Sequence, residues 1–348
     1  MRAWRVHEFG EPADVLVAED VDPPTAADLV GLGMSMGGWI PIAEGGRGPY
    51  DDWVLLDMTV AALALPDVTM ARGSYPVPVP RPYTSGQEGV GIVVDAGPTH
   101  RRLLGSRVAA CCIQPFGSLA PVAIGVGTMF EVPDDMTDEE GAAFVVPAHT
   151  AYHVVHRRGR VQPGETVAVL GAAGDIGSAY VQLCVALGAR VIAIVGGPEK
   201  VAFCEGLGAE AVDHTAGGVV EAVRAATGGR GVDVIIDPVQ GEAGAELRAV
   251  LVPDGRHVLC GHAGGLVAHD PNFYVANHTL VGATLGGYPP DEMRRIHDES
   301  DAALRVLMEQ GRYRPIVSEV VDFEEVPRVL TDMIERRTMG RVVVRVAD

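Results

Sequence analysis

The stretch that decides the fold is Gly171-Ala172-Ala173-Gly174-Asp175-Ile176-Gly177. It follows a short apolar strand candidate, residues 165–170, and opens a helix candidate over residues 176–187; a second strand candidate covers residues 190–195. A glycine-rich turn in this context predicts dinucleotide binding, because glycines allow a tight turn and close approach of a pyrophosphate to helix N–H groups. Ala172 stands at the first glycine of the strict pattern, so an ordinary glycine-rich turn is the alternative.

The pattern on either side of this stretch indicates two kinds of domain. Strand candidates continue at residues 233–237, 257–260, 316–321 and 341–346, and helix candidates at residues 200–207, 301–310 and 324–336. Strands alternating with helices predict a parallel sheet covered on both faces. The first third instead has short strands over residues 89–95 and 106–111, which indicates a smaller β-rich domain. Thr137 followed by Glu140 predicts a helix that begins with a capping box.

The length and net charge of the chain limit the number of domains and the classes of partner that it can bind. The 348 residues correspond to about two domains at roughly 150 residues each. A formal net charge of −19 argues against a nucleic-acid partner, which needs a basic face. The sequence contains no apolar run of about 18 residues, so no membrane-spanning segment is predicted. The five cysteines are irregularly spaced and Met1–Val6 shows no secretory signal, so we expect free thiols and a cytoplasmic location.

The end of the second strand predicts which dinucleotide binds. The segment is Val195-Gly196-Gly197-Pro198-Glu199-Lys200, whereas NAD-binding units usually place a carboxylate there to hold the ribose 2′-hydroxyl. The two glycines leave room, and Lys200 can offer its ammonium group to a 2′-phosphate. Glu199 argues against this, but it lies past the turn and Pro198 separates it from the strand. Lys200 is the only lysine among 27 basic residues. We therefore predict NADP(H); a solvated lysine at a helix start is the alternative.

Further stretches resemble the zinc-independent quinone oxidoreductase branch of the medium-chain dehydrogenase/reductase superfamily. They are SGQEGV at residues 85–90, HTAYH at 149–153, GAAGDIG at 171–177, GGRGVDVIIDP at 228–238 and GRHVLCG at 255–261. The resemblance runs through nearly the whole chain. It implies an α/β fold in which a Rossmann dinucleotide-binding domain is inserted into a β-rich GroES-like catalytic domain, with the active site in the cleft between them.

The resemblance also implies domain limits. We expect the GroES-like catalytic domain over residues 1–144, with an insertion at 30–52, and the Rossmann NADP(H)-binding domain over residues 145–288. Residues 289–348 are expected to return to the catalytic domain. Dimers of the family pair through a late Rossmann strand, here Thr279–Leu285, so a homodimer is expected.

A set of residues is implied to line the cofactor by its position in the family. The set is Thr150, Gly174, Asp175, Ile176, Gly177, Gly196, Lys200, His214, Val239, Cys260, Gly261 and His262. His214 stands where the family often has a tyrosine near the adenosine. Tyr75 matches a family tyrosine near the active site, where it is expected to contact the substrate oxygen or relay a proton; an ordinary surface tyrosine is the alternative.

The chain departs from the zinc-dependent relatives at two metal-ligand positions. Ala64 stands where those relatives have a cysteine, and Gln87 stands at the histidine of their GHE motif. Neither residue is a usual zinc ligand, so we expect no catalytic metal. His149, His153 and His156 share a helical face, but they lack the glutamate of HExxH and are not expected to bind metal.

Three functions remain to be separated. The leading one is hydride transfer from NADPH to a quinone or a conjugated carbonyl substrate such as an enone. Gly33-Met34-Ser35-Met36-Gly37 also fits the G-x-S-x-G elbow of serine hydrolases, but Pro41 would break the helix that must follow, and a glycine-rich loop is favoured. A non-catalytic NADPH-binding protein is the third, supported by Ala64 where quinone-reductase relatives often have asparagine.

Overall fold

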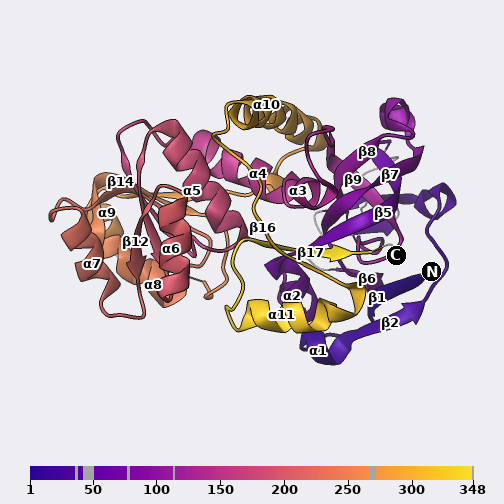
Figure 1. Cartoon of the computed structure of the whole chain (residues 1–348), viewed down its shortest axis with the longest axis horizontal. Helices are drawn as coiled ribbons and strands as arrows, with labels where there is room; N and C mark the ends of the chain where they lie inside the picture. Colours follow the sequence, from indigo (N-terminus) through magenta and orange to yellow (C-terminus); the bar gives the residue numbers. More distant parts are fainter. Residues whose placement is uncertain (36–37, 42–50, 77–78, 113, 267–271, 347–348) are drawn as a thin grey trace. The chain divides into compact units, whose positions relative to one another are not determined.

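The computed structural model describes residues 1–35, 38–41, 51–76, 79–112, 114–266 and 272–346 (Figure 1). The chain forms two compact units. The first unit comprises Met1–Val146, Gly286–Arg295 and Pro315–Asp348, so both ends of the chain belong to it. The second unit comprises Pro147–Leu285 and Ile296–Arg314.

The second unit is built on a six-stranded, fully parallel sheet in the order β12-β11-β10-β13-β14-β15. Its strands are β10 (Thr166–Leu170), β11 (Arg190–Val195), β12 (Glu210–Asp213), β13 (Val232–Asp237), β14 (Leu251–Leu259) and β15 (Thr279–Gly282). The helices that lie wholly in this unit are α5 (Asp175–Leu187), α6 (Pro198–Gly206), α7 (Val219–Ala226), α8 (Gly241–Leu247) and α9 (Asn272–Val275). Helices α4 (Val145–Tyr152) and α10 (Pro290–Glu309) begin with residues of the first unit and continue in the second. Helix α5 packs on β10 and β11, and α6 packs on β11 and β12.

The strand order creates a switch point. The chain runs outward from β10 through β11 to β12, then crosses back to β13 on the other side of β10 and continues outward to β15. Every residue of β10 is buried, as expected of a central parallel strand covered on both faces. In open parallel sheets, ligands bind outside the carboxyl ends of the strands where the strand order reverses. The loops after β10 and β13 meet this condition.

The first unit is mainly antiparallel. Its largest sheet has the order β16-β17-β5-β7-β8-β9, and β5 also pairs with β9, so four strands close on themselves. The strands are β1 (Arg2–Val6), β2 (Leu16–Asp20), β3 (Leu32–Ser35), β4 (Gly38–Pro41), β5 (Trp53–Leu63), β6 (Tyr83–Thr84), β7 (Glu88–Ala96), β8 (Arg107–Cys112), β9 (Val122–Glu131), β16 (Val317–Val321) and β17 (Arg341–Arg345). The helices are α1 (Pro12–Val15), α2 (Leu65–Ala71), α3 (Asp138–Ala142) and α11 (Val326–Ile334).

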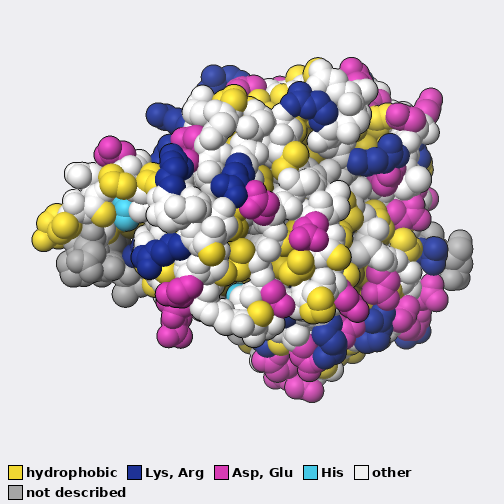
Figure 2. Space-filling model, turned by 60° about the vertical axis from the view of Figure 1, so that its left-hand side comes forward, with side chains coloured by type: hydrophobic (Ala, Val, Ile, Leu, Met, Phe, Trp, Pro, Cys, Tyr) yellow, Lys and Arg dark blue, Asp and Glu magenta, His cyan; other side chains and the backbone are white. Residues whose placement is uncertain are grey.

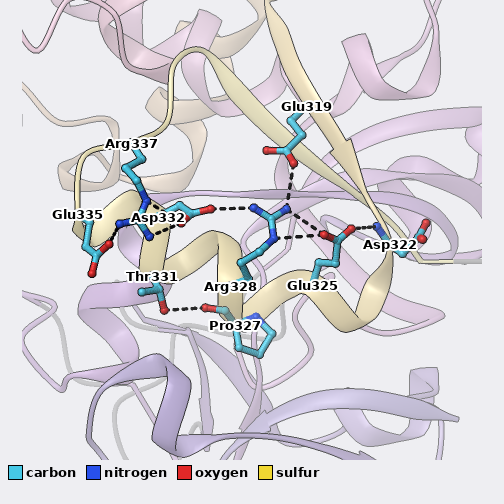
Figure 3. Close-up of polar contacts among 9 residues, drawn as sticks. All are labelled: Glu319, Asp322, Glu325, Pro327, Arg328, Thr331, Asp332, Glu335 and Arg337. Carbon is cyan, nitrogen blue, oxygen red and sulfur yellow. Dashed lines mark hydrogen bonds and ion pairs between the residues drawn. The ribbon is translucent and has the colours of Figure 1, made fainter. Parts of the chain in front are cut away.

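Helix α11 carries an exposed network of ion pairs (Figure 3). Arg328 contacts Glu319, Glu325 and Asp332, and Arg337 contacts Asp332 and Glu335. The opposite face of α11 contributes Val329 and Leu330 to the apolar core of the first unit. The helix is thus amphipathic, with charge outside and aliphatic side chains inside.

The expected α/β fold is confirmed, including the capping box, in which Thr137 accepts a hydrogen bond from the Glu140 N–H. Two expectations on the elements need correction. Helix α10 begins at Pro290 rather than at residue 301, because its first turn has the proline and acidic residues that favour a helix start. Strand β5, at 11 residues the longest of the first unit, was not anticipated.

None of the helices in the described part of the chain is both long enough and apolar enough to cross a bilayer. On the face drawn in Figure 2, Lys and Arg side chains are interspersed with Asp and Glu. All five cysteines are free thiols.

Candidate functional site

The turn after β10 forms a cradle at the switch point. Gly171 adopts a φ of +60°, and the Gly174 N–H donates to its carbonyl at 3.0 Å. Gly174 caps α5, whose first intrahelical hydrogen bond runs from the Ser178 N–H to the Gly174 carbonyl. The N–H groups of Asp175, Ile176 and Gly177 therefore precede the helix ladder, which is the arrangement of a helix N-terminus that binds an anion.

Gly177 fixes how close the helix lies to the strand. A Cβ atom at this position would come within 2.1 Å of the Gly171 carbonyl oxygen, far inside contact distance. Glycine is thus a geometric requirement here, in the role of the last glycine of a dinucleotide fingerprint. The cradle consequently fits a pyrophosphate, although Ala172 replaces the first glycine.

Two further loops adjoin the cradle at the same edge of the sheet. A Cβ atom on Gly171 would lie 3.4 Å from the Val239 side chain, in the loop after β13. The Val239 carbonyl accepts a hydrogen bond from Gly264 at 2.7 Å, and the Cys260 N–H donates to the Asp237 carbonyl at 3.1 Å. The structure therefore brings together three loops, after β10, β13 and β14, that the sequence assigned to the cofactor.

Four more residues predicted to line the cofactor lie in the loop after β14 and on α4. Cys260, Gly261 and His262 follow β14 and are partly exposed. Burial raises the pKa of the Cys260 thiol to about 12, so this residue is a neutral thiol rather than a nucleophile. Thr150 lies on α4, partly exposed, and its part in the site stays a prediction.

The turn after β11 holds the other predicted residues. Gly196 lies against His214, such that a Cβ atom at Gly196 would come 3.0 Å from the His214 Nε2 atom. The His214 N–H donates to the Val195 carbonyl at 2.9 Å, and its side chain is exposed. Lys200 is on the first turn of α6 and partly exposed. Gly196, His214 and Lys200 thus surround the start of α6.

A carboxylate that the sequence analysis missed closes this turn. Asp213 accepts hydrogen bonds on one oxygen from the Gly197 N–H at 3.0 Å and from the Thr215 N–H and hydroxyl at 2.9 and 2.6 Å. These bonds, that from Gly197 foremost, hold the pKa of Asp213 below its usual value, so it is ionised at neutral pH. The sequence analysis considered only residues 195–200; Asp213 reaches this turn because parallel strand β12 pairs it with Val195.

In the first unit, Tyr75 belongs to a polar cluster. Its hydroxyl lies beside the Gln87 side chain; burial raises the Tyr75 pKa, and the nearby amide partly opposes the rise. Asp67 is fully buried nearby and accepts hydrogen bonds from the Ala64 N–H at 2.9 Å and the Gly86 N–H at 3.1 Å. Burial raises the pKa of Asp67 to about 6. Asp67 therefore ties together the segments that carry Ala64 and Gln87.

A buried ion pair supports the same region. Arg341 on β17 contacts the Glu88 carboxylate, and both side chains are almost fully buried. The second Glu88 oxygen accepts a hydrogen bond from the Val146 N–H at 2.9 Å. Strand β7, which begins at Glu88 directly after Gln87, is thereby fixed to β17 and to the start of α4.

No group of three or more His, Cys, Asp or Glu side chains among the described residues could hold a metal ion. His149 on α4 and His153, the first residue of the π-helical segment that follows, are both buried, and His149 packs edge-on against His297 at a 5.8 Å centroid distance. Burial, together with the nearby Arg157 and Arg158, lowers the pKa of His153 to about 4. These histidines pack inside the second unit.

The hydrolase interpretation of Ser35 meets a local obstacle. Ser35 ends β3, which pairs with β4 in a two-stranded antiparallel sheet, whereas residues 36–37 and 42–50 lie outside the described residues. A nucleophile elbow requires a helix after the serine. The next described residues, 38–41, form a strand, and residues 33–35 of the motif, expected to be part of a loop, belong to strand β3.

Known protein families match both units. The family model described as alcohol dehydrogenase GroES-like domain matches residues 50–136, and the one described as zinc-binding dehydrogenase matches residues 176–302. The rat (Rattus norvegicus) quinone oxidoreductase-like protein 2 is 30% identical over 302 residues, which cover 85% of each chain.

Solved structures show the same similarity over nearly the whole chain. The quinone oxidoreductase of Thermus thermophilus, solved alone and in complex with NADPH, is 28% identical with a TM-score of 0.79, covering 99% of this chain and 100% of that one. The Escherichia coli quinone oxidoreductase complexed with NADPH has a TM-score of 0.84 at 22% identity, with the same coverage, and supports the fold. This chain belongs to the quinone oxidoreductase branch of the medium-chain dehydrogenase/reductase superfamily.

Proposed function

We propose that the protein is an NADPH-dependent reductase that transfers a hydride to quinones or conjugated carbonyl compounds. Its family makes it an oxidoreductase. The observation that carries the cofactor assignment is the Gly171–Gly177 cradle, where Gly177 admits no Cβ atom and three α5 N–H groups precede the helix ladder. The NADPH complex of the 28% identical Thermus thermophilus enzyme supports the same cofactor.

Different residues of the second unit would bind different parts of the cofactor. The N–H groups at the start of α5 would bind the pyrophosphate, with Asp175, Ile176 and Gly177 supplying them. Gly196, Lys200 and His214 would hold the adenosine and its 2′-phosphate. Val239, Cys260, Gly261, His262 and Thr150 would line the nicotinamide half. This division follows the strand order, which places the loops after β10, β13 and β14 at one edge.

When bound, NADPH supplies the hydride. The chain's own residues would orient the reacting atoms and exclude water. Tyr75, which burial keeps protonated and which lies beside Gln87, would donate a hydrogen bond to the substrate oxygen. A quinone or enone suits such a site, because the reduced oxygen takes its proton from Tyr75 or from water without a strong acid.

A substrate panel tests this function. Oxidation of NADPH, followed by its absorbance, is expected with several quinones and enones and is expected to be much slower with NADH. The pyridine cofactor should also bind without any acceptor, as seen by quenching of protein fluorescence. Binding without turnover on every acceptor would favour a non-catalytic role. If the protein neither binds NADPH nor oxidises it with any acceptor, the proposal is refuted.

We further propose a homodimer that forms through the edge of the parallel sheet. β15 is the edge strand, and Leu266, Tyr274 and Val275 near it are 83%, 73% and 67% exposed. Hydrophobic side chains are visible at the left-hand side of Figure 2. An exposed strand edge flanked by apolar side chains favours pairing with another chain. Light scattering should give twice the 36.5 kDa chain mass, whereas Tyr274→Asp should give the monomer. A cytoplasmic location stays a prediction.

A further inference from the structure

Gln240 has a backbone conformation that is normally restricted to glycine. Its φ is +56° and its ψ is −143°, just after β13 ends at Asp237. For a residue with a Cβ atom this conformation is strained, and it persists only where the surroundings hold it in place. Strained residues of this kind cluster at ligand-binding sites, so the contacts that keep Gln240 in this conformation bear on its function.

Two hydrogen bonds at opposite ends of Gln240 hold it. Its backbone N–H donates to Asp237 Oδ1 at 2.6 Å, and the neighbouring Val239 N–H donates to the same oxygen at 2.9 Å. Its side-chain amide donates to the Gly261 carbonyl oxygen. Gln240 is therefore a bridge between the loop after β13 and the loop after β14.

Beneath this bridge lies a buried chain of charged and polar side chains. His257 Nε2 lies 2.8 Å from Asp237 Oδ2, and Arg248 Nε donates to His257 Nδ1 at 3.1 Å. Asp237 and His257 are fully buried, and Arg248 is 8% exposed. Because the guanidinium can only donate, Nδ1 must accept and Nε2 carries the proton that is donated to Asp237.

This chain leaves Asp237 little freedom. One carboxylate oxygen faces His257 and the other faces the N–H groups of Val239 and Gln240. A Cβ atom on Gly244 of α8 would come within 2.1 Å of Asp237 Oδ2, so the helix also closes over the carboxylate. Arg248, His257 and Asp237 thus fix the loop after β13 from inside the sheet.

We propose that Gln240 is a positioning residue for the nicotinamide half of the cofactor, held in its strained conformation by the Arg248–His257–Asp237 chain. The inference rests on the proposed function. Val239 adjoins the Gly171 turn, and Gly261 is the residue whose carbonyl Gln240 holds, so both loops of the nicotinamide half depend on one side chain. The cradle and the Gly196 turn, which would hold the pyrophosphate and the adenosine, do not depend on it.

Because Gln240 is strained, replacing it with glycine has different expected effects on stability for a positioning role and for a structural role. Gln240→Gly removes the bridge but also relieves the backbone strain, so thermal stability should be unchanged or higher. A residue that only stabilised the fold would lower the unfolding temperature and weaken every ligand together. Asp254→Gly is the matched control, because Asp254 has a φ of +63°, is exposed and lies within β14 away from its carboxyl end.

The experiment measures the affinities of the wild type, Gln240→Gly and Asp254→Gly for NADPH and for 2′,5′-ADP, which carries the adenosine half alone. We expect Gln240→Gly to weaken NADPH about three- to tenfold, the equivalent of one hydrogen bond, and to leave 2′,5′-ADP unchanged. Turnover at saturating NADPH should fall as well. Asp254→Gly should change neither affinity.

The outcomes distinguish the inference from the function on which it rests. If the wild type binds neither NADPH nor 2′,5′-ADP, the proposed function fails and the inference fails with it. If the wild type binds both but Gln240→Gly leaves NADPH affinity and turnover intact, only the inference is overturned. The same holds if Gln240→Gly weakens both ligands equally or lowers the unfolding temperature.

Discussion

The side chain of Gln87 lies beside the hydroxyl of Tyr75, where it partly opposes the rise in the Tyr75 pKa that burial causes. By the family resemblance, Gln87 stands in place of a zinc-ligating histidine. Asp67 accepts hydrogen bonds from the Ala64 and Gly86 N–H groups, so it ties the start of α2 to the residue that precedes Gln87.

Tyr75→Phe should reduce turnover, because it removes the hydroxyl that would contact the substrate oxygen while retaining the ring. A neutral hydrogen bond corresponds to roughly 0.5–1.5 kcal/mol, so the expected loss is about two- to tenfold in kcat. NADPH affinity should not change. Steady-state rates on several acceptors, together with a direct NADPH titration, provide the measurement; unchanged rates throughout would assign Tyr75 to packing.

The pH profile provides an internal control. Burial raises the Tyr75 pKa above its ordinary value of 10.0, so the proton stays on the phenol over the whole neutral and mildly alkaline range. The wild-type rate should therefore not decline through ionisation of Tyr75 until the pH exceeds that value. A drop in kcat near pH 8 that disappears in Tyr75→Phe would contradict this.

Chelation should leave the activity intact. Ala64 and Gln87 offer no usual zinc ligands, in contrast to the name of the family model that matches residues 176–302. Activity after prolonged dialysis against EDTA should equal that of untreated protein. Metal analysis should find far less than one zinc per chain, and stoichiometric zinc with loss of activity on its removal would overturn the expectation.

The sequence predicted the parallel sheet well because its signals are local. The strand candidate at 165–170, the glycine-rich turn and the helix candidate at 176–187 correspond to β10, the cradle and α5 within one residue at each boundary. The start of α10 was missed because it lies ahead of the helix candidate at 301–310 in a proline-rich segment. Strand β5 was missed although its burial alternates over residues 53–60, because apolar residues such as Trp53 and Leu55 also occupy its less buried face and hide the alternation in the sequence.

The site was harder to predict, because its decisive contacts cross strands. The role of Asp213 depends on the register of β12 against β11, and no feature of the Val195–Lys200 segment reveals it. The bridge from Gln240 to Gly261 depends on two loops about twenty residues apart in the sequence. A signal was nevertheless present, since a polar side chain follows the Asp237-Pro238 turn where strand β13 ends.

Lys200→Ala should weaken NADPH binding and leave NADH binding unchanged. A charge-assisted hydrogen bond contributes about 1.5–3 kcal/mol, so the expected loss is roughly 10- to 150-fold in NADPH affinity. NADH lacks the 2′-phosphate and has no such contact to lose. Titrating both cofactors against both proteins tests the assignment. If the substitution lowers the affinities for NADPH and NADH equally, Lys200 does not contact the 2′-phosphate.

Asp213→Asn should strengthen NADPH binding. Asparagine can still accept hydrogen bonds from Gly197 and Thr215 through its amide oxygen, so the turn should keep its conformation while losing a negative charge near the proposed 2′-phosphate site. Because Asp213 is exposed and its charge is screened by solvent, the expected gain in NADPH affinity is only about two- to fivefold. The gain should shrink at high salt and be absent for NADH. Weaker binding of both cofactors would show that the carboxylate is needed to form the turn.

His257→Leu should destabilise the second unit strongly, because it leaves Asp237 and Arg248 without the imidazole that joins them in the interior. Removing one partner from a buried charged network typically costs about 3–5 kcal/mol. Arg328→Ala is the contrasting variant, since it removes the centre of the exposed network of Figure 3, and its cost is expected to stay below about 1 kcal/mol. Urea unfolding of both variants, at fixed protein concentration to control for dimerisation, measures the two costs. If the two variants unfold at the same urea concentration, the buried chain contributes no more than surface charge does, and the rigidity assigned to Asp237 would have to come from its backbone contacts alone.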